Sequence, residues 1–461
     1  MSQPVLPMVV QREYRRTGEA ARPSMMHTNF HGVIDDEVGA DGAQAAVRVA
    51  DIDRVVIIND FSATNGGCSG LALLSLRLFR QLGIPITYIC GDEGDPQLAG
   101  PAVEVVALGG ESILTADPGS SIVKGIHNAA AKAMVARWIE AHDTPRTIYH
   151  VHGWAKILSP AIFVALSRVA ARTVIHAHDF FLACPNGAFY DYPSQKLCDL
   201  EPLSLKCITT QCDKRNYAQK LWRAARSSRL HALLSNGKAP FSNIILIHEK
   251  MAPLFERSGF PEASLHTLRN PVVPFTKERV RAEENSEFFF VGRLDTEKGI
   301  EDVAAAAVGA GIRLNVIGNG PLAKNLAKYG PSIRLLGWHT HQEIAARIRK
   351  ARAVILPTRY PEPFGLVALE ASLSGIPVIL SDKAYLADEM VSAGVAIGCD
   401  TTNSEAFQAT LRRVAYMPRE EIRAMSIRAF EAVVRPATTP TEWRDGLIGH
   451  YQNLLEQKDP A

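Results

Sequence analysis

Two carboxylates eight residues apart are the first candidates for chemistry. They are Glu362 and Glu370 in "EPFGLVALE", where a helix is expected to begin near Gly365. Glu370 is the only charged residue between Gly365 and Leu380, in a segment otherwise suited to burial. A buried carboxylate needs hydrogen-bond donors, because leaving it unpaired costs several kcal/mol. Two ribose hydroxyls would supply them; a salt bridge to a neighbouring strand is the alternative. For Glu362, a polar ligand group and a plain loop position stay open.

The start of this helix is also suited to an anion. The backbone amides of Phe364, Gly365 and Leu366 have no partner within the helix and would face a phosphate. Upstream, "FFFVGRLDTEKGIEDV" ends a strand at Val291 and then carries Gly292, Arg293 and Lys298. Two cations at the carboxyl end of a parallel strand suit a diphosphate. A solvated turn balanced by nearby acids is the alternative.

Glycine-rich turns recur after other predicted strands. Gly318 lies in "VIGNGPL", and Gly337 and Trp338 lie in "LLGWH". Near the N-terminus, Gly66 and Gly67 follow the strand "RVVIIND" and precede a leucine-rich helix, which would let a ligand approach the backbone. A simple tight turn is the other interpretation, because the full G-x-G-x-x-G pattern is absent.

Histidines and cysteines form a third group. "TVIHAHDFFLACPNG" ends a strand with His176, His178 and Asp179, which could bind a metal, act in catalysis or simply form hydrogen bonds. Downstream come four cysteines, Cys184, Cys198, Cys207 and Cys212. They could hold a structural zinc ion, form one or two disulfides, or stay unconnected. Such a zinc site would have no open coordination position and no catalytic role.

A basic stretch follows the cysteines. Arg223, Arg226 and Arg229 recur every three residues beside Trp222, which predicts a basic helical face. Such a face is usually only solvated. In this place it could instead contact an acceptor or an anionic membrane surface.

The elements that position these residues alternate between β-branched runs and helical stretches, which predicts βαβ units and parallel sheets. One series runs through residues 51–270, with a cysteine-rich insert around 184–212, and the second through 271–440. Residues 1–50 are expected to be an irregular extension, and 441–461 a final helix. The fold class is therefore α/β, with two Rossmann-like doubly wound domains facing across a crevice.

Composition narrows the class of protein. The chain has 461 residues and a formal net charge of +2, which argues against a nucleic-acid binder. No apolar run approaches the ~20 residues that span a bilayer. The start of the chain is a poor signal peptide. An odd number of cysteines, seven, argues against a fully paired secreted framework. We therefore expect a cytoplasmic protein, with association at the inner membrane face left open.

The segment from Glu362 to Val378, "EPFGLVALEASLSGIPV", closely resembles the signature of family-4 retaining glycosyltransferases (glycosyltransferases group 1) of the GT-B fold. "GRLDTEKG" resembles the phosphate loop of that family, and "GNGP" and "LLGW" follow in its order. The turn at Gly66-Gly67 and "HAHDFFLACP" are similar to its acceptor-domain landmarks. The resemblance covers roughly residues 54–435 and is more specific in the second half.

The resemblance implies a retaining hexosyltransferase that moves a sugar from a UDP or GDP donor to a glycan or lipid-linked acceptor in polysaccharide or glycoconjugate synthesis. It implies roles for individual residues too. Glu370 would hold the ribose, Glu362 and His178 would contact the donor sugar, and Arg293 and Lys298 would neutralise the leaving diphosphate in place of a metal. Donor contacts would come from Gly66, Gly67, Gly292, Gly318, Gly337, Trp338, Phe364, Gly365 and Leu366. No cofactor is expected for catalysis, apart from the structural zinc ion considered above.

Other classes stay open at this stage. A GT-B fold also serves sugar phosphorylases and an epimerase, so the fold alone does not fix the activity. A nucleic-acid-binding protein could use the cysteine cluster and the basic helix. A catalytically silent relative is disfavoured because both acids and both cations are present. For the reaction itself we expect front-face attack, since no carboxylate nucleophile stands out.

Overall fold

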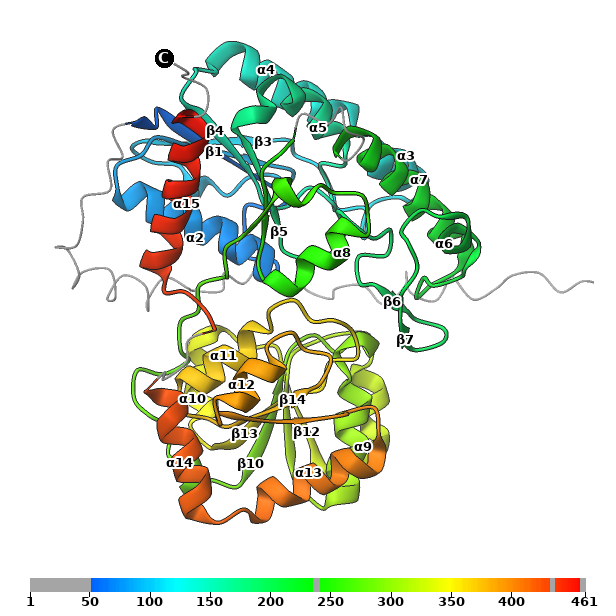
Figure 1. Ribbon diagram of the computed structural model, residues 1–461, viewed down its shortest axis with the longest axis vertical. Coiled ribbons are helices and arrows are strands. Elements are labelled where there is room, and N and C mark those ends of the chain that lie inside the picture. The colour runs from blue at the N-terminus through cyan, green and yellow to red at the C-terminus, as the bar shows by residue number, and fades with distance from the viewer. Residues whose placement is uncertain (1–50, 235–240, 432–435, 457–461) are drawn as a thin grey trace, which may run out of the picture.

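The structure is a computed structural model that describes residues 51–234, 241–431 and 436–456. The predicted irregular extension, residues 1–50, lies outside this part of the chain. Figure 1 shows two α/β domains, one above the other, each built around a central sheet. The predicted pair of Rossmann-like domains is therefore confirmed.

The first domain contains a parallel sheet of seven strands in the order β3-β2-β1-β4-β5-β8-β9. The central strands are buried along almost their whole length, because helices cover both faces of the sheet. The strands are β1 (Arg54–Asn59), β2 (Ile86–Cys90), β3 (Val103–Ala107), β4 (Thr147–Val151), β5 (Thr173–Ala177), β8 (Ile244–Leu246) and β9 (Leu265–Thr267).

Several helices of this domain begin at a capping residue or a glycine turn. Asn128, for example, accepts a hydrogen bond from the amide of Ala131 and so caps α4. The helices are α2 (Gly67–Gln81), α3 (Pro118–Ile126), α4 (Ala129–His142), α5 (Ala161–Leu166), α6 (Leu205–Thr209), α7 (Tyr217–Leu234) and α8 (Ala252–Glu256).

The second domain repeats the architecture with six parallel strands in the order β12-β11-β10-β13-β14-β15. The strands are β10 (Glu287–Val291), β11 (Leu314–Ile317), β12 (Ile333–Gly337), β13 (Ala351–Leu356), β14 (Val378–Ser381) and β15 (Ala396–Cys399). The helices are α9 (Ile300–Ala310), α10 (His341–Ile348), α11 (Leu366–Leu373), α12 (Ala387–Ser392), α13 (Ser404–Tyr416) and α14 (Arg419–Phe430). The strand order reverses beside β10, which is where such sheets bind ligands.

The last helix, α15 (Pro440–Glu456), returns to the first domain and packs beside α2 (Figure 1). Its apolar side chains, including Trp443 and Tyr451, are buried against the strands and α2. The two chain crossings between the domains also touch, since the Val272 amide donates to the Thr438 carbonyl at 3.0 Å. The sequence did not predict on which domain this helix packs. Its buried apolar side chains place it on the first domain.

The cysteine-rich insert forms a hairpin of β6 (Tyr190–Asp191) and β7 (Lys196–Leu197), followed by α6. It reaches toward the second domain (Figure 1). Arg359 donates to the Gln195 side chain at 2.9 Å, and Lys214 lies 3.4 Å from Glu297. The insert therefore bridges the two domains. In the described ranges, no helix is long and apolar enough to cross a membrane.

Candidate active site

The loops that follow β10 and β11 pack closely against each other. A Cβ atom added to Gly318 would overlap the carbonyl of Gly292, and Gly318 has a φ of 139°. Gly299, which ends the turn that carries Lys298, has a φ of 67° and lies directly against the Pro357 carbonyl. These glycines let three loops meet at the carboxyl edge of the sheet, next to the start of α11.

Lys298 and Glu362 form the centre of the site. The Lys298 ammonium lies 2.5 Å from Oε2 of Glu362 and 3.2 Å from the hydroxyl of Tyr360. Thr358 donates to the same Glu362 oxygen at 3.4 Å. Both charged side chains are largely shielded from water, so each holds the other in a defined position.

Arg293 is more exposed than Lys298. Its guanidinium is paired with Asp295 at 2.9 Å and with Glu297 at 3.4 Å. The acids of this turn therefore do balance the charge of Arg293, as the alternative interpretation expected. Asp295 and Glu297 are themselves buried, so they can orient the guanidinium while it stays accessible to a ligand.

The N-terminus of α11 opens toward the first domain. Gly365 precedes the helix with a φ of 65°, and no side chain caps the helix there. A Cβ atom added to Gly67 would lie 3.6 Å from Leu366, so the Gly66-Gly67 turn faces the start of this helix. The Phe364 side chain is buried in the core, which leaves its backbone as the part able to reach a ligand. The structure thus brings together two glycine turns that lie 300 residues apart.

Glu370 lies one turn into α11, and its side chain is 13% exposed. Burial raises the pKa of its carboxyl group to about 8. His341 Nε2 lies 3.8 Å from the carboxylate, and burial lowers the pKa of that imidazole. No strand cation pairs with Glu370 among the ion pairs of the described residues. The described structure therefore gives the Glu370 carboxyl group a histidine neighbour but no strand cation to balance its charge.

His178 belongs to a group of four stacked histidines at the carboxyl ends of β4 and β5. Its Nε2 lies 3.0 Å from Nδ1 of His152, and His150 pairs with His176 at 3.2 Å. The Tyr451 hydroxyl lies 2.6 Å from His150. Burial lowers the pKa of His178 to about 3, so its imidazole is neutral at physiological pH. Its Nδ1 is buried without a hydrogen-bond partner in the described structure, which leaves one polar contact for a ligand.

The two halves of the site face each other. Phe180, just after His178, packs edge-on against Tyr385 of the second domain, with ring centroids 6.4 Å apart. The Tyr385 amide in turn donates to the carbonyl of Glu362 at 3.2 Å. At the other side, Gly337 has a φ of 78° and Trp338 is 39% exposed after β12. The contacts of Tyr385 therefore connect the segment after His178 in the first domain to Glu362 in the second.

The four cysteines do not fit a zinc ion in this arrangement. A tetrahedral zinc site needs its sulfur atoms within about 4 Å of one another. In the described part of the chain, the groups that meet a comparable criterion are His150–His152–His176 and His248–Glu249–Glu389. All four cysteines are free thiols, and the Lys220 ammonium lies between two of them. A cation in that position opposes a metal cation.

The prediction of one basic helical face is wrong. Residues three apart drift around a helix, and the three arginines of α7 point in different directions. Arg226 is buried, donates to the Ala155 carbonyl at 2.6 Å and stacks on Trp154. Arg223 is paired with Asp213 at 2.8 Å. Arg229 alone of the three is exposed, beside His127.

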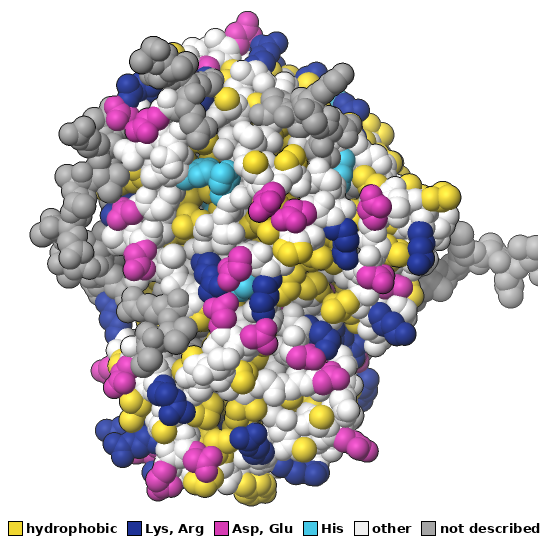
Figure 2. All heavy atoms as spheres, viewed as in Figure 1, with side chains coloured by type: hydrophobic (Ala, Val, Ile, Leu, Met, Phe, Trp, Pro, Cys, Tyr) yellow, Lys and Arg dark blue, Asp and Glu magenta, His cyan; other side chains and the backbone are white. Residues whose placement is uncertain are grey.

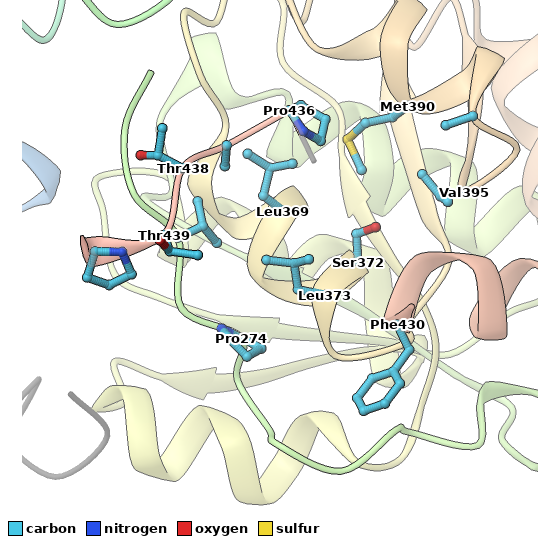
Figure 3. Close-up of a pocket in the computed structure, with 14 residues that line it drawn as sticks. Pro274, Leu369, Ser372, Leu373, Met390, Val395, Phe430, Pro436, Thr438 and Thr439 are labelled. Carbon is cyan, nitrogen blue, oxygen red and sulfur yellow. The ribbon is translucent and has the colours of Figure 1, made fainter. Parts of the chain in front are cut away.

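An apolar cavity of about 200 Å³ lies beside α11 (Figure 3). Leu369 and Leu373 of α11 line it together with Met390 of α12 and Thr438 of the interdomain crossing. Among the described residues, no Lys, Arg, Asp or Glu lines this cavity. It is therefore unsuited to a diphosphate.

Sequence reasoning missed three residues near the site. Thr358 contacts Glu362 and Tyr360 contacts Lys298, so both help to position the pair. Their segment, "PTRYPEP", has no strand or helix periodicity that would have indicated this role. Asp60, at the end of β1, accepts hydrogen bonds from the amides of residues 156–158 and so fixes the loop beside the crevice. A polar residue directly after a buried strand could have indicated Asp60.

Two parallel-sheet domains with a charged crevice between their carboxyl edges define the GT-B architecture. The chain matches a sucrose-phosphate synthase from Thermosynechococcus elongatus with a TM-score of 0.66 and 16% identity, over 88% of this chain and 100% of that one. It also matches the Anabaena protein Alr3699/HepE in complex with UDP and glucose, with a TM-score of 0.59 and 14% identity over 87% and 99%. At these identities the likeness shows the fold.

Sequence comparison points to the same class of protein. Residues 274–431 match the family model described as glycosyl transferases group 1. A glycogen synthase from Mycobacterium tuberculosis is 26% identical over 305 residues, which cover 62% of this chain and 69% of the relative. A GDP-mannose-dependent alpha-mannosyltransferase from Corynebacterium glutamicum is 34% identical over 90 residues, 20% and 22% of the two chains. The second domain, residues 274–431, therefore matches the group 1 glycosyltransferases, and the comparisons support a transferase enzyme.

Proposed function

We propose that this glycosyltransferase moves a hexosyl group from a UDP or GDP donor to a glycan or lipid-linked acceptor, with retention of anomeric configuration. The observation that carries the proposal is the Lys298–Glu362 pair beside the uncapped N-terminus of α11. A cation and free amides at one point suit a leaving diphosphate. Polysaccharide or glycoconjugate synthesis is the role we infer for the product.

The second domain would bind both the ribose and the base of the donor nucleotide. Glu370 would accept hydrogen bonds from two ribose hydroxyls, which would compensate the burial of its charge. The base would lie against the turn of Leu336–Trp338, and UDP and GDP both fit this description. The complex of Alr3699/HepE with UDP and glucose supports a nucleotide-sugar donor.

The reaction would depend on stabilising the departing charge. As the bond between the anomeric carbon and the phosphate oxygen breaks, the diphosphate gains negative charge, and Lys298 and Arg293 would stabilise it. We propose that this makes catalysis independent of a metal. A phosphate oxygen of the leaving group would take the proton of the acceptor hydroxyl during attack on the same face.

His178 would contact the donor sugar from the first domain. Its low pKa keeps the imidazole neutral, so it would serve as a hydrogen-bond partner through Nδ1. Glu362 would accept a sugar hydroxyl while its other contact holds Lys298. These two residues would position the sugar between the domains.

A membrane surface on the acceptor domain is part of the proposal. Figure 2 shows hydrophobic side chains reaching the surface over α3 and α7, at the right edge of the upper domain. Apolar side chains more than half exposed include Ile122 and Val123 of α3 and Leu205 of the neighbouring α6, and Lys124 and Lys206 lie beside them in the chain. Exposed apolar and basic side chains together suit an anionic bilayer surface. We propose peripheral binding at the inner face of a membrane.

Co-sedimentation of the full chain with anionic phospholipid vesicles tests this surface. We expect Val123→Ser with Leu205→Ser to reduce binding severalfold, and the control Tyr416→Ser, which changes an exposed aromatic residue on the second domain, to leave it intact. Equal loss in both variants, or no binding by the unaltered chain, would rule the surface out. If the chain instead binds nucleic acid, with an affinity that falls steeply as salt is added, the alternative of a nucleic-acid-binding protein would be supported.

A thermal-shift panel with UDP, GDP, ADP and their sugar conjugates tests the donor site. A ligand that binds only the folded state raises its stability by mass action. We expect one nucleotide series to stabilise the unaltered chain and the shift to collapse in Glu370→Ala. No shift with any nucleotide at millimolar concentration would contradict the proposed donor site. A trapped glycosyl-enzyme adduct would overturn front-face attack.

A further inference from the structure

The cysteine-rich insert contains an unusual contact between a buried lysine and two thiols. Lys220 of α7 is 1% exposed, although lysine is almost never fully buried. Its Nζ lies 3.1 Å from Sγ of Cys212 and 3.3 Å from Sγ of Cys207. Both cysteines are also buried. One amine is therefore in contact with two sulfur atoms in a site shielded from water.

These three groups must share protons. An unpaired ammonium in such a place is strongly disfavoured, so a partial thiolate has to balance it. Burial acts to lower the pKa of Lys220, but the negative charge available on Cys212 and Cys207 outweighs it and leaves the pKa above its usual value. Burial raises the pKa of the Cys212 thiol, and Lys220 opposes that rise.

The surroundings hold the sulfur atoms in place. Asn186 donates to Sγ of Cys212 at 3.4 Å and accepts from Sγ of Cys184 at 3.2 Å. The Cys212 carbonyl accepts from the amide of Tyr192 at 3.4 Å. With the sulfur and nitrogen atoms preorganised at contact distance, little movement is needed to join them.

We propose that Lys220 and Cys212 form an oxidation-sensitive site in which peroxide links the two side chains through one oxygen atom, as S–O–N. The thiolate sulfur attacks a peroxide oxygen and the O–O bond breaks. The hydroxide released takes a proton from the Lys220 ammonium, so a sulfenic acid, a neutral amine and one water form. A second peroxide oxidises the amine to a hydroxylamine and releases another water. The hydroxylamine oxygen then attacks the sulfenic sulfur, and the sulfenic hydroxyl leaves with a proton as a third water. Sulfur and nitrogen each lose two electrons, and the two peroxides accept four.

The contacts favour this link over a direct S–N bond or a Cys207–Cys212 disulfide. A bridging oxygen spans a nitrogen and a sulfur that lie near contact distance, whereas a direct bond needs a much closer approach. The lysine amine contacts both sulfurs, so an oxidised Cys212 already has this nitrogen at contact distance. The nearness of Cys207 makes it the second thiol that could exchange onto the link.

The link would reach the proposed donor site. Two residues after Cys212, Lys214 contacts Glu297, which also contacts Arg293. Movement of Cys212 toward Lys220 would therefore displace Lys214, and with it the ion pairs of Glu297. The effect on transfer rests on the function proposed above, but the existence of the link does not.

Mass spectrometry of the full chain tests the link directly. The protein is reduced, then treated with hydrogen peroxide, and both samples are examined intact and after tryptic digestion. We expect a gain of one oxygen less two hydrogens, loss of tryptic cleavage after Lys220, and recovery by thiol reductant. Cys212→Ser should abolish the change, whereas Cys399→Ser, at a half-buried thiol of the second domain, should preserve it.

Two results would overturn the proposal. One is a Cys207–Cys212 disulfide, or simple sulfinic acid, with Lys220 still cleavable by trypsin. The other is stoichiometric zinc in the purified protein that protects all four thiols. Nucleotide-dependent thermal shifts before and after oxidation distinguish the two proposals: a link without any nucleotide response would support the redox site and count against the donor site.

Discussion

The ammonium of Lys298 lies 2.5 Å from Oε2 of Glu362, and this pair joins the loop after β10 to the loop before α11. Without a ligand, the carboxylate balances the lysine charge. A diphosphate would share the lysine charge, and the second oxygen of Glu362 would be available for the sugar. The two residues therefore hold each other in the orientation that the proposed transfer needs.

Replacing Lys298 tests the charge on the leaving group. We expect Lys298→Ala to lower kcat/KM for sugar transfer by about 10²–10³, because a preorganised cation is lost from the departing diphosphate. Steady-state kinetics with the donor found by thermal shift would measure this. Lys328→Ala removes an exposed cation that pairs with Glu301 and should leave the rate unchanged. Similar rates in both variants would contradict the role of Lys298.

The Glu370 carboxyl gives a pH dependence with a defined sign. Its pKa is about 8 in the folded protein and near 4.5 when unfolded, so the folded state binds more protons between these values. The free energy of unfolding should therefore fall as pH rises from about 4.5 to about 8, by an amount on the order of a few kcal/mol.

Urea unfolding at pH 6 and pH 8 would measure this contribution. Glu370→Gln keeps the shape of the side chain but cannot ionise, so it should be more stable than the unaltered chain at pH 8 without nucleotide. The same variant should lose nucleotide-dependent stabilisation. If Glu370→Gln is less stable at pH 8, the carboxylate has a structural partner that the geometry does not reveal.

The buried histidines predict the opposite trend in acid. Burial lowers the pKa of His178 to about 3 and holds the pKa values of His150, His152 and His176 well below the usual value. The unfolded chain then binds more protons below pH 6.5. Stability should fall steeply as pH drops from about 6.5 toward 3.

Chemical denaturation between pH 4 and pH 7 checks this trend. His178→Asn removes one titrating group and should flatten the acid limb, while lowering transfer about 10–100-fold through loss of a sugar contact. Nucleotide binding should be unaffected, since His178 would touch the sugar alone. An unchanged acid limb in His178→Asn would show that another group controls it.

The arginines of α7 should differ in their effect on stability. Arg226→Ala removes a buried guanidinium that bonds Ala155 and stacks on Trp154, so we expect a loss of about 2–3 kcal/mol. Arg229→Ala changes an exposed residue and should cost less than about 0.5 kcal/mol. Differential scanning calorimetry compares the two; equal losses would refute the burial of Arg226.

Much of the architecture could be predicted from the sequence, because its signals are local. Alternating β-branched runs and helical stretches determine a parallel sheet in each domain. The acids and cations of the donor domain lie within loops whose position follows from strand order, so "EPFGLVALE" and "GRLDTEKG" were enough to indicate their meeting. Side chains at the carboxyl ends of adjacent parallel strands must meet at one edge.

Tertiary structure decided what depends on contacts between distant segments. Spacing in α7 could not show that Arg226 would turn inward while Arg229 stays exposed, because that depends on Trp154 and the Ala155 carbonyl. The spacing of the four cysteines also could not show that Lys220 would lie between two of them. The sequence by itself determined the elements and the charges of the donor loops, since these follow from local periodicity. Only packing between elements decided which of the other charged side chains are buried and paired.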